Sequence, residues 1–567
     1  KIYSAIDTVD TQNHTMRSFL ISACLFFSFP LFLFSQHSRP TQPKIIVGIV
    51  VDQMRYDYLY KYWSSYGEGG FKRLLSEGYS CENTHYNYMP TYTGPGHAAI
   101  YTGTTPSVNG VVANIWWDRE WADERYVTSD PNYLTVGSPD TMVGQHSPKV
   151  LLSSTITDEL RLSNNFRSKV VGVCIKDRGS ILPAGHIPNA CYWFDDKSGN
   201  WITSSYYTDS LALPEWVTAF NDRKLAASYL GNKWSKLPGA DYSQSFENWD
   251  EFKGGKYLPL FKGGMPYDLA AIRAKMKDEY LIRFTPFGNR LTLDFALEAV
   301  EKMELGKDEF PDFLCLSFSC TDYIGHQFGV HAEETQDAYL KLDKDLTRLL
   351  SFLDQRFGKD NALVFLTADH GAAETPAHLK SIGFPVDVFK EHKLKARLDS
   401  MLLDQFGNSK SFVLYAENQQ VWLNWDNIQS SRATPEQVEQ AIIDYIRHQP
   451  GVYDVFSKEQ LSSAPPEFPF VDKWRRGIHP QRSGDISFQL QPGWHGDDKS
   501  FKEGGTTHGT AYAYDTHVPL VWYGWHVKSG ETYEPVDITD IAPTIAAMLR
   551  IMEPNGTTGK VILPLMR

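Results

Sequence analysis

The feature that most constrains the fold is a repeated pattern, in which a short run of mainly β-branched apolar residues leads to a polar residue capable of chemistry. The runs are Ile45–Val51 before Asp52, Val170–Ile175 before Lys176, Phe313–Phe318 before Asp322, Ala362–Leu366 before Asp369, and a further run of the same kind at Val518–Tyr523. Continuous apolar runs are typical of strands buried on both faces of a parallel sheet. The pattern predicts such a sheet, with reactive side chains at its strand ends.

Helical patterns separate several of these runs. Apolar residues recur at steps of three and four between 337 and 353, and residues 540–549 predict another helix. Alternating strands and helices predict an α/β class with a doubly wound, mostly parallel central sheet flanked by helices. Ligands of such folds bind at the carboxyl ends of the strands, which is where the polar residues stand.

Two stretches interrupt the alternation. Residues 185–290 are rich in aromatic residues, Gly and Pro. Residues 373–505 contain a strand-like segment, Phe412–Trp425, and a helix that starts with Thr434 as N-cap, Pro435 and a capping box completed by Gln437. We interpret both stretches as insertions that cap the site of one catalytic domain over residues 37–567.

The N-terminal region has a different character. Met16 and Arg17 precede an apolar run over 19–34 that contains Pro30. The pattern is typical of a signal peptide, and the run is short for a membrane-spanning helix. We expect residues 1–36 to be upstream residues and a signal peptide, and the mature chain to be periplasmic or secreted, without a membrane partner.

The charge balance limits the partners. The formal net charge is −13, which argues against broad nucleic-acid binding because that requires a basic surface. We therefore expect no dedicated nucleic-acid partner, and we expect a monomer. An acidic protein can still bind phosphate where metal ions and a few basic groups make one site positive.

The strongest local motif is the TYTGPGHAAI run that begins at Thr91. Its Gly-Pro-Gly segment predicts a tight turn, and a helix of small residues follows. The hydroxyl of Thr93 would lie beside free backbone N–H groups at the positive end of the helix dipole, where anions bind. Taken alone, the segment fits a plain threonine N-cap at least as well.

A second motif is a set of carboxylates and histidines suited to zinc. The set comprises Asp52, Asp322, His326, Asp369, His370 and His508. Asp322 and His326 are four residues apart, so one helical turn places both on one face. Any single member fits a capping Asp or a core His, but their joint position favours a metal site. Local sequence barely separates His508 from His495, which begins a similar His-Gly pair.

The third motif is basic. In an extended chain, Lys176 and Arg178 point to the same side, where two cations can hold a dianionic phosphoryl group. Alternatively, this segment is an exposed charged turn without a role in phosphate binding. Asn114 adds an amide donor.

Together these motifs resemble the alkaline phosphatase superfamily. The matching residues, in order and spacing, are Asp52, Thr93 with its Gly-Pro-Gly-His turn, Thr102-Gly103 with Pro106, Asn114, Asp322 with His326, Asp369-His370-Gly371 and His508-Gly509. Lys176 with Arg178 makes the chain similar to phosphate-irrepressible alkaline phosphatases of the PafA type. The resemblance covers about residues 44–550.

The resemblance implies two zinc ions per chain and assigns roles to the matching residues. One zinc would be held by Asp322, His326 and His508, and the other by Asp52, Asp369 and His370, with Thr93 as a further ligand. The phosphoryl oxygens would be bound by Asn114, Lys176 and Arg178.

The resemblance also implies a reaction, the hydrolysis of phosphate monoesters through a covalent phosphothreonine at Thr93. Two other functions stay open. A phosphodiesterase or nucleotide pyrophosphatase of the same superfamily needs an apolar pocket in place of two cations. A zinc-dependent phosphate-binding protein without turnover would not need a complete nucleophile and both metal sets.

Overall fold

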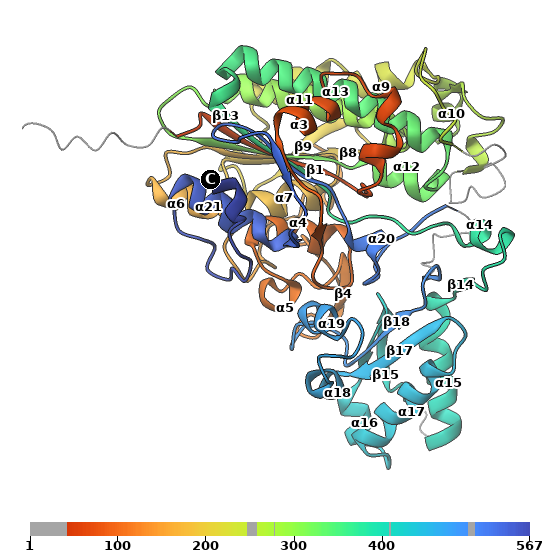
Figure 1. The fold of residues 1–567 in the computed structure, drawn as a ribbon. Coiled ribbons are helices and arrows are strands. Elements are labelled where there is room, and N and C mark those ends of the chain that lie inside the picture. The colour runs from red at the N-terminus through yellow and green to blue at the C-terminus, as the bar shows by residue number, and fades with distance from the viewer. Residues whose placement is uncertain (1–41, 246–257, 277, 408–409, 497–504, 567) are drawn as a thin grey trace, which may run out of the picture. The chain divides into compact units, whose positions relative to one another are not determined.

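The computed structural model has a mixed sheet of ten strands at the centre of its described residues, which are 42–245, 258–276, 278–407, 410–496 and 505–566 (Figure 1). The strand order is β21-β2-β20-β13-β1-β12-β7-β8-β9-β6, and the last strand, β6, is Thr135–Val136. Four neighbouring strands at its centre run parallel and are fully buried, namely β7 (Val170–Cys174), β12 (Asp312–Phe318), β1 (Ile45–Val51) and β13 (Ala362–Thr367). These strands confirm the α/β class and four of the predicted runs.

The sheet is parallel only in part. The predicted run Val518–Tyr523 forms β20 (Leu520–Gly524), which is antiparallel to β13. On its other side, β20 pairs with β2 (Tyr79–Cys81), and β2 pairs in turn with β21 (Gly530–Thr532). A buried apolar run shows that both faces of a strand are covered, but the connections of the chain set its direction. The predicted mostly parallel sheet is confirmed at its centre, and the sheet as a whole is mixed because antiparallel strands flank that centre.

Helices cover both faces of the sheet (Figure 1). On one face lie α11 (Pro286–Lys302) and α13 (Glu333–Phe357), and on the other lie α4 (Thr93–Thr102), α7 (Asp177–Ala184) and α21 (Ile541–Leu549). Helices α13 and α21 confirm the helices predicted over 337–353 and 540–549. A two-residue loop after β7 brings the start of α7 to the edge where the reactive residues stand, whereas α4 follows β3 (Thr84–His85), which lies outside the central sheet.

Residues 185–290, interpreted as a cap, also build the central sheet. They contribute β8 (Ala190–Asp195), parallel to β7, and β9 (Asn200–Ser204), antiparallel to β8. Trp201 stacks on Phe295 of α11 with ring centroids 4.4 Å apart. Part of the aromatic content of this stretch therefore belongs to the core of the sheet.

The second insertion forms a lobe with a sheet and an apolar core of its own. Its antiparallel sheet contains β15 (Val413–Glu417), β16 (Gln420–Leu423), β18 (Ile486–Leu490) and β17 (Val452–Ser457). The segment predicted as one strand, Phe412–Trp425, is therefore a hairpin, and it turns at Asn418 and Gln419, whose φ angles are 60° and 57°. The predicted capping box is confirmed at the start of α17 (Pro435–Arg447).

The predicted signal peptide in residues 1–36 lies outside the described residues, and Pro43–Arg567 form one compact unit. Within the part of the chain that is described, the helices are too short or too polar to cross a membrane.

Candidate metal centre

Three adjacent parallel strands bring the predicted carboxylates to one edge of the sheet. Asp52 follows β1, Asp369 and His370 follow β13, and Asp322 lies in α12 (Cys320–Phe328), which begins directly after β12. Because β12, β1 and β13 are neighbours with the same direction, their carboxyl ends open at one place.

The inner group consists of Asp52, Asp369 and His370, whose side chains are fully buried. His370 Nε2 lies 3.5 Å from Asp52 Oδ1 and 3.7 Å from Asp369 Oδ2. Among the described residues, none of these three atoms has a hydrogen-bond partner. Buried polar atoms without partners are costly, and a metal cation between two carboxylates and an imidazole would satisfy all three. The inner group therefore fits a metal ion.

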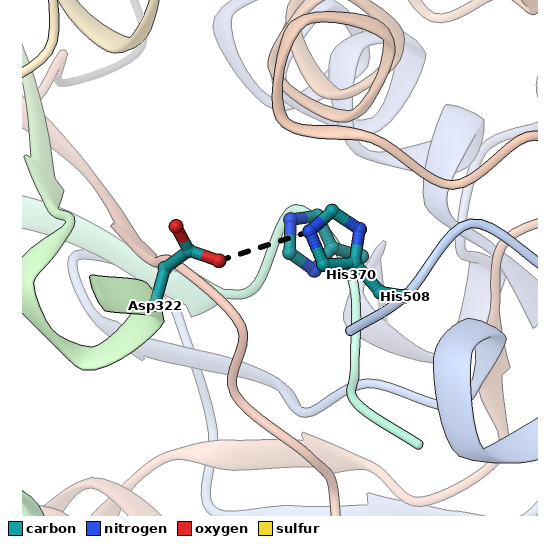
Figure 2. Close-up of side chains that lie close together, drawn as sticks. All are labelled: Asp322, His370 and His508. Atoms are coloured by element: carbon teal, nitrogen blue, oxygen red, sulfur yellow. Dashed lines mark ion pairs between the residues drawn. The ribbon is translucent and has the colours of Figure 1, made fainter. Parts of the chain in front are cut away.

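The outer group consists of Asp322, His326 and His508. Asp322 Oδ1 lies 3.0 Å from His326 Nε2 and 3.7 Å from His508 Nε2. Figure 2 shows Asp322 facing the imidazoles of His370 and His508, which stack with centroids 3.4 Å apart. Ligand atoms of Asp322, His370 and His508 lie within 4.8 Å of one another, so the stacked rings join the two groups into one centre.

The three histidines are oriented in the same way. Each Nδ1–H donates to a backbone carbonyl, which is that of Thr506 for His326 (2.7 Å), Gly371 for His370 (3.0 Å) and Thr91 for His508 (2.7 Å). A carbonyl only accepts, so these bonds fix the tautomer and leave the lone pair of Nε2 directed at the carboxylates. Metal-binding histidines are normally held in this way.

Lys176 lies between the two groups. It is buried, and its Nζ is 2.7 Å from Asp52 Oδ2 and 2.7 Å from Asp322 Oδ2. Burial opposes its charge, but Asp322 and Asp52 outweigh burial and raise the pKa of Lys176. Burial likewise opposes ionisation of Asp322, yet His326 and Lys176 hold its pKa well below the usual range.

Asp369 behaves in the opposite way. Burial and the neighbouring charge of Asp52 raise the pKa of Asp369 well above its usual range. Without metal, the centre thus concentrates more carboxylates than Lys176 can balance. A divalent cation would supply the missing positive charge.

Thr93 is the first residue of α4 and is buried. The N-cap of α4 is Tyr92, whose side chain makes no capping hydrogen bond, so Thr93 is not the N-cap that its sequence context also allows. The backbone N–H of Gly94 donates to Asn114 Oδ1 at 2.8 Å. This bond holds Asn114 beside the first turn of α4 and leaves its NH₂ group to donate elsewhere.

The basic pair is arranged differently from the prediction. Lys176 has extended backbone, but α7 begins at Asp177, so Arg178 lies in a helical turn and the two side chains do not share a face by strand alternation. Arg178 Nη1 donates to Tyr126 OH at 3.0 Å, and Tyr126 OH donates to Asp177 Oδ1 at 2.8 Å. Lys176 therefore reaches the carboxylates of the centre, whereas Arg178 is directed to Tyr126.

Two tyrosines in the centre lie outside the predicted set. The ring of Tyr323 lies 4.8 Å from Lys176 Nζ, and its hydroxyl accepts a hydrogen bond of 2.8 Å from Arg283. Arg283 is held in turn by Asp196 at 2.6 Å. Tyr323 directly follows Asp322, so its place in that motif could have indicated it. Tyr126 belongs to no motif.

Comparison with known proteins agrees with this geometry. A model of the type I phosphodiesterase / nucleotide pyrophosphatase family matches residues 46–511, more than half of the chain. The chain is 42% identical over 527 residues to alkaline phosphatase PafA of Elizabethkingia meningoseptica, with 92% of this chain and 94% of the relative covered. The crystal structure of wild-type PafA matches with a TM-score of 0.87 and 41% identity, and it covers 93% of this chain and 99% of that chain.

Two further relatives extend over the same length. Alkaline phosphatase PhoV of Synechococcus elongatus is 40% identical over 529 residues, with 93% of each chain covered. A protein of Myroides odoratus named calcium-transporting ATPase is 43% identical over 556 residues, with 96% of this chain and 98% of the relative covered.

Proposed function

This chain belongs to the type I phosphodiesterase / nucleotide pyrophosphatase family and is an alkaline phosphatase that hydrolyses phosphate monoesters, and from this premise we propose that it works with two zinc ions and a covalent phosphothreonine at Thr93. The two-metal proposal rests on the fully buried ligand atoms of the inner group, which have no hydrogen-bond partner among the described residues, and on the second cluster around Asp322. Bound zinc would lower the pKa of the Thr93 hydroxyl and stabilise charge on the departing oxygen.

The chain's own residues would position the phosphoryl group. Thr93 stands at the start of α4, where backbone N–H groups and the helix dipole favour an anion. Asn114, held by the Gly94 N–H, has its NH₂ group left to donate to a phosphoryl oxygen. Lys176 would supply positive charge from between the two groups, and Arg178 from beside Tyr126.

The reaction would consist of two displacements. In the first, a bond forms between Thr93 Oγ and phosphorus while the bond to the leaving alcohol oxygen breaks. In the second, water attacks the phosphothreonine, the Oγ–phosphorus bond breaks, and phosphate leaves. Two in-line steps retain configuration at phosphorus. The loose transition state needs charge stabilisation more than a strong push from the nucleophile.

The charge of the site favours monoesters over diesters. A monoester brings two negative charges and a diester one, and Lys176 with Arg178 suits the larger charge. The terminal phosphoryl group of ATP is also doubly charged, so ATP hydrolysis fits the same centre and belongs in the same assay. An aryl monoester, the matched diester and ATP should be compared, and a diester preference would contradict the proposal.

Trapping the intermediate tests the nucleophile. We expect acid quenching during turnover of a ³²P-labelled monoester to label Thr93. Thr93→Ala should abolish the label while phosphate binding remains detectable, and Thr105→Ala should serve as the control that keeps it. A label on another residue would overturn the assignment of Thr93.

We also propose that the mature protein acts as a periplasmic or secreted monomer without a nucleic-acid or membrane partner. The signal-peptide pattern before residue 37 supports export, and the net charge of −13 supports the absence of a nucleic-acid partner. Fractionation of the producing cells and light scattering of the purified protein test it.

A further inference from the structure

A second group of metal-binding side chains lies outside the central site. One ligand atom from each of His331, Glu374 and His378 lies within 4.8 Å of the others. Glu374 Oε2 is 2.8 Å from His331 Nε2, and the imidazoles of His331 and His378 have centroids 5.8 Å apart. We propose that these three residues, here called the rim cluster, form a third metal site, which binds a divalent transition metal of the zinc class.

The rim cluster continues the chain segments that carry the central ligands. His331 follows His326 on the segment that leaves α12, and Glu374 follows His370 on the segment that leaves β13. Ala373, next to Glu374, accepts a hydrogen bond from Thr506 Oγ1, and its N–H donates to Thr507 O at 3.0 Å. The rim cluster is thereby tied to the loop that carries His508.

The donor set matches zinc chemistry. Two imidazoles and one carboxylate form the set that zinc takes where it keeps an open coordination position. His331 Nε2 and Glu374 Oε2 already face each other at hydrogen-bond distance, as His326 and Asp322 do in the outer group. A bound metal needs its ligand atoms only slightly further apart than these pairs are. Small side-chain rotations would therefore open the position.

Arg55 supports the carboxylate without occupying its metal-facing oxygen. Its Nη1 lies 3.0 Å from Glu374 Oε1, which leaves Oε2 on the side of His331. Arg55 Nε also pairs with Asp57 Oδ1 at 2.8 Å, so its charge is shared between two carboxylates. Carboxylates that bind metals are commonly held by such outer hydrogen bonds.

Lys61 acts against the metal. Its Nζ is 2.8 Å from His331 Nδ1, and it places a cation next to a proposed ligand. The rim cluster has the same donor set as the outer group and one carboxylate fewer than the inner group, so this repulsion makes it a weaker site than either. Removal of the Lys61 charge should therefore raise the affinity of the rim cluster for zinc. If the rim cluster were only a hydrogen-bonded network without metal, the same change would not alter zinc binding.

The test is a zinc titration of the full chain. Protein stripped with a chelator is dialysed against buffers of controlled free zinc, and bound zinc is measured alongside activity. We expect activity to be restored by two equivalents and a third to bind at higher free zinc. Glu374→Gln and His378→Gln should stop at two equivalents and keep most activity, whereas the exposed control His448→Gln should bind three.

Two further measurements test whether the third equivalent binds at the rim cluster. Cobalt replaces zinc in a parallel titration, and the visible absorption of the third equivalent should be present in the wild type and lost in His331→Gln. Lys61→Met should bind the third equivalent about tenfold more tightly. Saturation of the wild type at two equivalents, or a third equivalent that persists in both Glu374→Gln and His378→Gln, would overturn the proposal.

Discussion

The inner and outer groups of the metal centre are built in different ways. Asp52 directly follows β1, Asp369 and His370 follow the neighbouring β13 after one residue, and all three are fully buried. The outer group combines helix α12 with the distant loop of His508, and the side chain of His326 is 32% exposed. Rigid strand ends fix the inner group, whereas contacts between distant segments assemble the outer one. We therefore expect the inner group to hold its metal more tightly.

The largest expected effect comes from removing one ligand of each group. Asp369→Asn should lower monoester kcat/KM by roughly a thousandfold or more. It removes one buried charged ligand from the inner group, which costs on the order of 4 kcal/mol. His326→Gln should lose less and regain activity in excess zinc, because the exposed position admits exchange. Activity and zinc content are measured with and without added zinc. Equal loss without recovery in both variants would remove the distinction between the groups.

The next effect concerns Lys176, which contacts both groups, and Arg178, which contacts neither. Loss of a charge-assisted contact costs roughly 1.5–3 kcal/mol, on the order of ten- to a hundredfold. We expect Lys176→Ala to lower monoester kcat/KM near the upper end of this range and Arg178→Ala near the lower end. Diester kcat/KM should fall clearly less in both. An equal fall for both substrates would mean that the pair supports the structure or the metals.

Acid should separate the two groups as well. Burial opposes the charge on His326, but Asp322 outweighs burial and raises the pKa of His326. Burial lowers the pKa of His370 to about 4. Protons compete with metal for imidazole. Each pH unit below the raised pKa of His326 should therefore weaken metal binding by the outer group about tenfold. His370 in the inner group stays neutral until the pH nears its own pKa. Dialysis at stepwise lower pH should remove one zinc before the other.

A variant shows which group loses its zinc first. His326→Gln should remove the earlier step and leave the later one unchanged. Simultaneous loss of both ions, or an earlier step that survives in His326→Gln, would contradict the difference between the groups.

The smallest expected effect comes from the tyrosines that support the basic pair. Tyr323→Leu removes the ring beside Lys176 and should lower monoester kcat/KM by about tenfold, whereas Tyr323→Phe keeps the ring and should lose only severalfold. Tyr126→Phe removes the acceptor of Arg178 and should also cost severalfold. The ratio of monoester to diester kcat/KM is the readout, since a structural role would lower both rates together.

The sequence located the central strands and the residues at their ends because both depend on local pattern. A buried strand needs a continuous apolar run wherever it lies. Asp52 comes directly after such a run, and Asp369 comes three residues after the end of another. The capping box of Thr434 and Gln437 was equally local. The combined order of these motifs indicated the family.

Features that depend on distant contacts could not be predicted. The antiparallel direction of β20 follows from its connections. The aromatic sequence of β8 and β9 taken alone indicates part of a cap, because the central sheet that they join is assembled from distant segments. Residues 176–178 also lack an extended pattern because the helix begins immediately after Lys176. The contacts of Lys176 with two carboxylates join segments far apart in the sequence, so no local pattern contains them.

The placement of β20 between β2 and β13 has a consequence for synthesis of the chain. Strand β2 emerges early from the ribosome, but both of its partners, β20 and β21, lie near the other terminus. About 440 residues separate Ser80 from its partner Val521, so at ordinary translation rates β2 waits roughly 20–90 seconds for a neighbour. The β13 edge waits for the same strand. A nascent or truncated chain that stops before Leu520 therefore exposes unpaired backbone on two strands, the kind of edge on which chains aggregate.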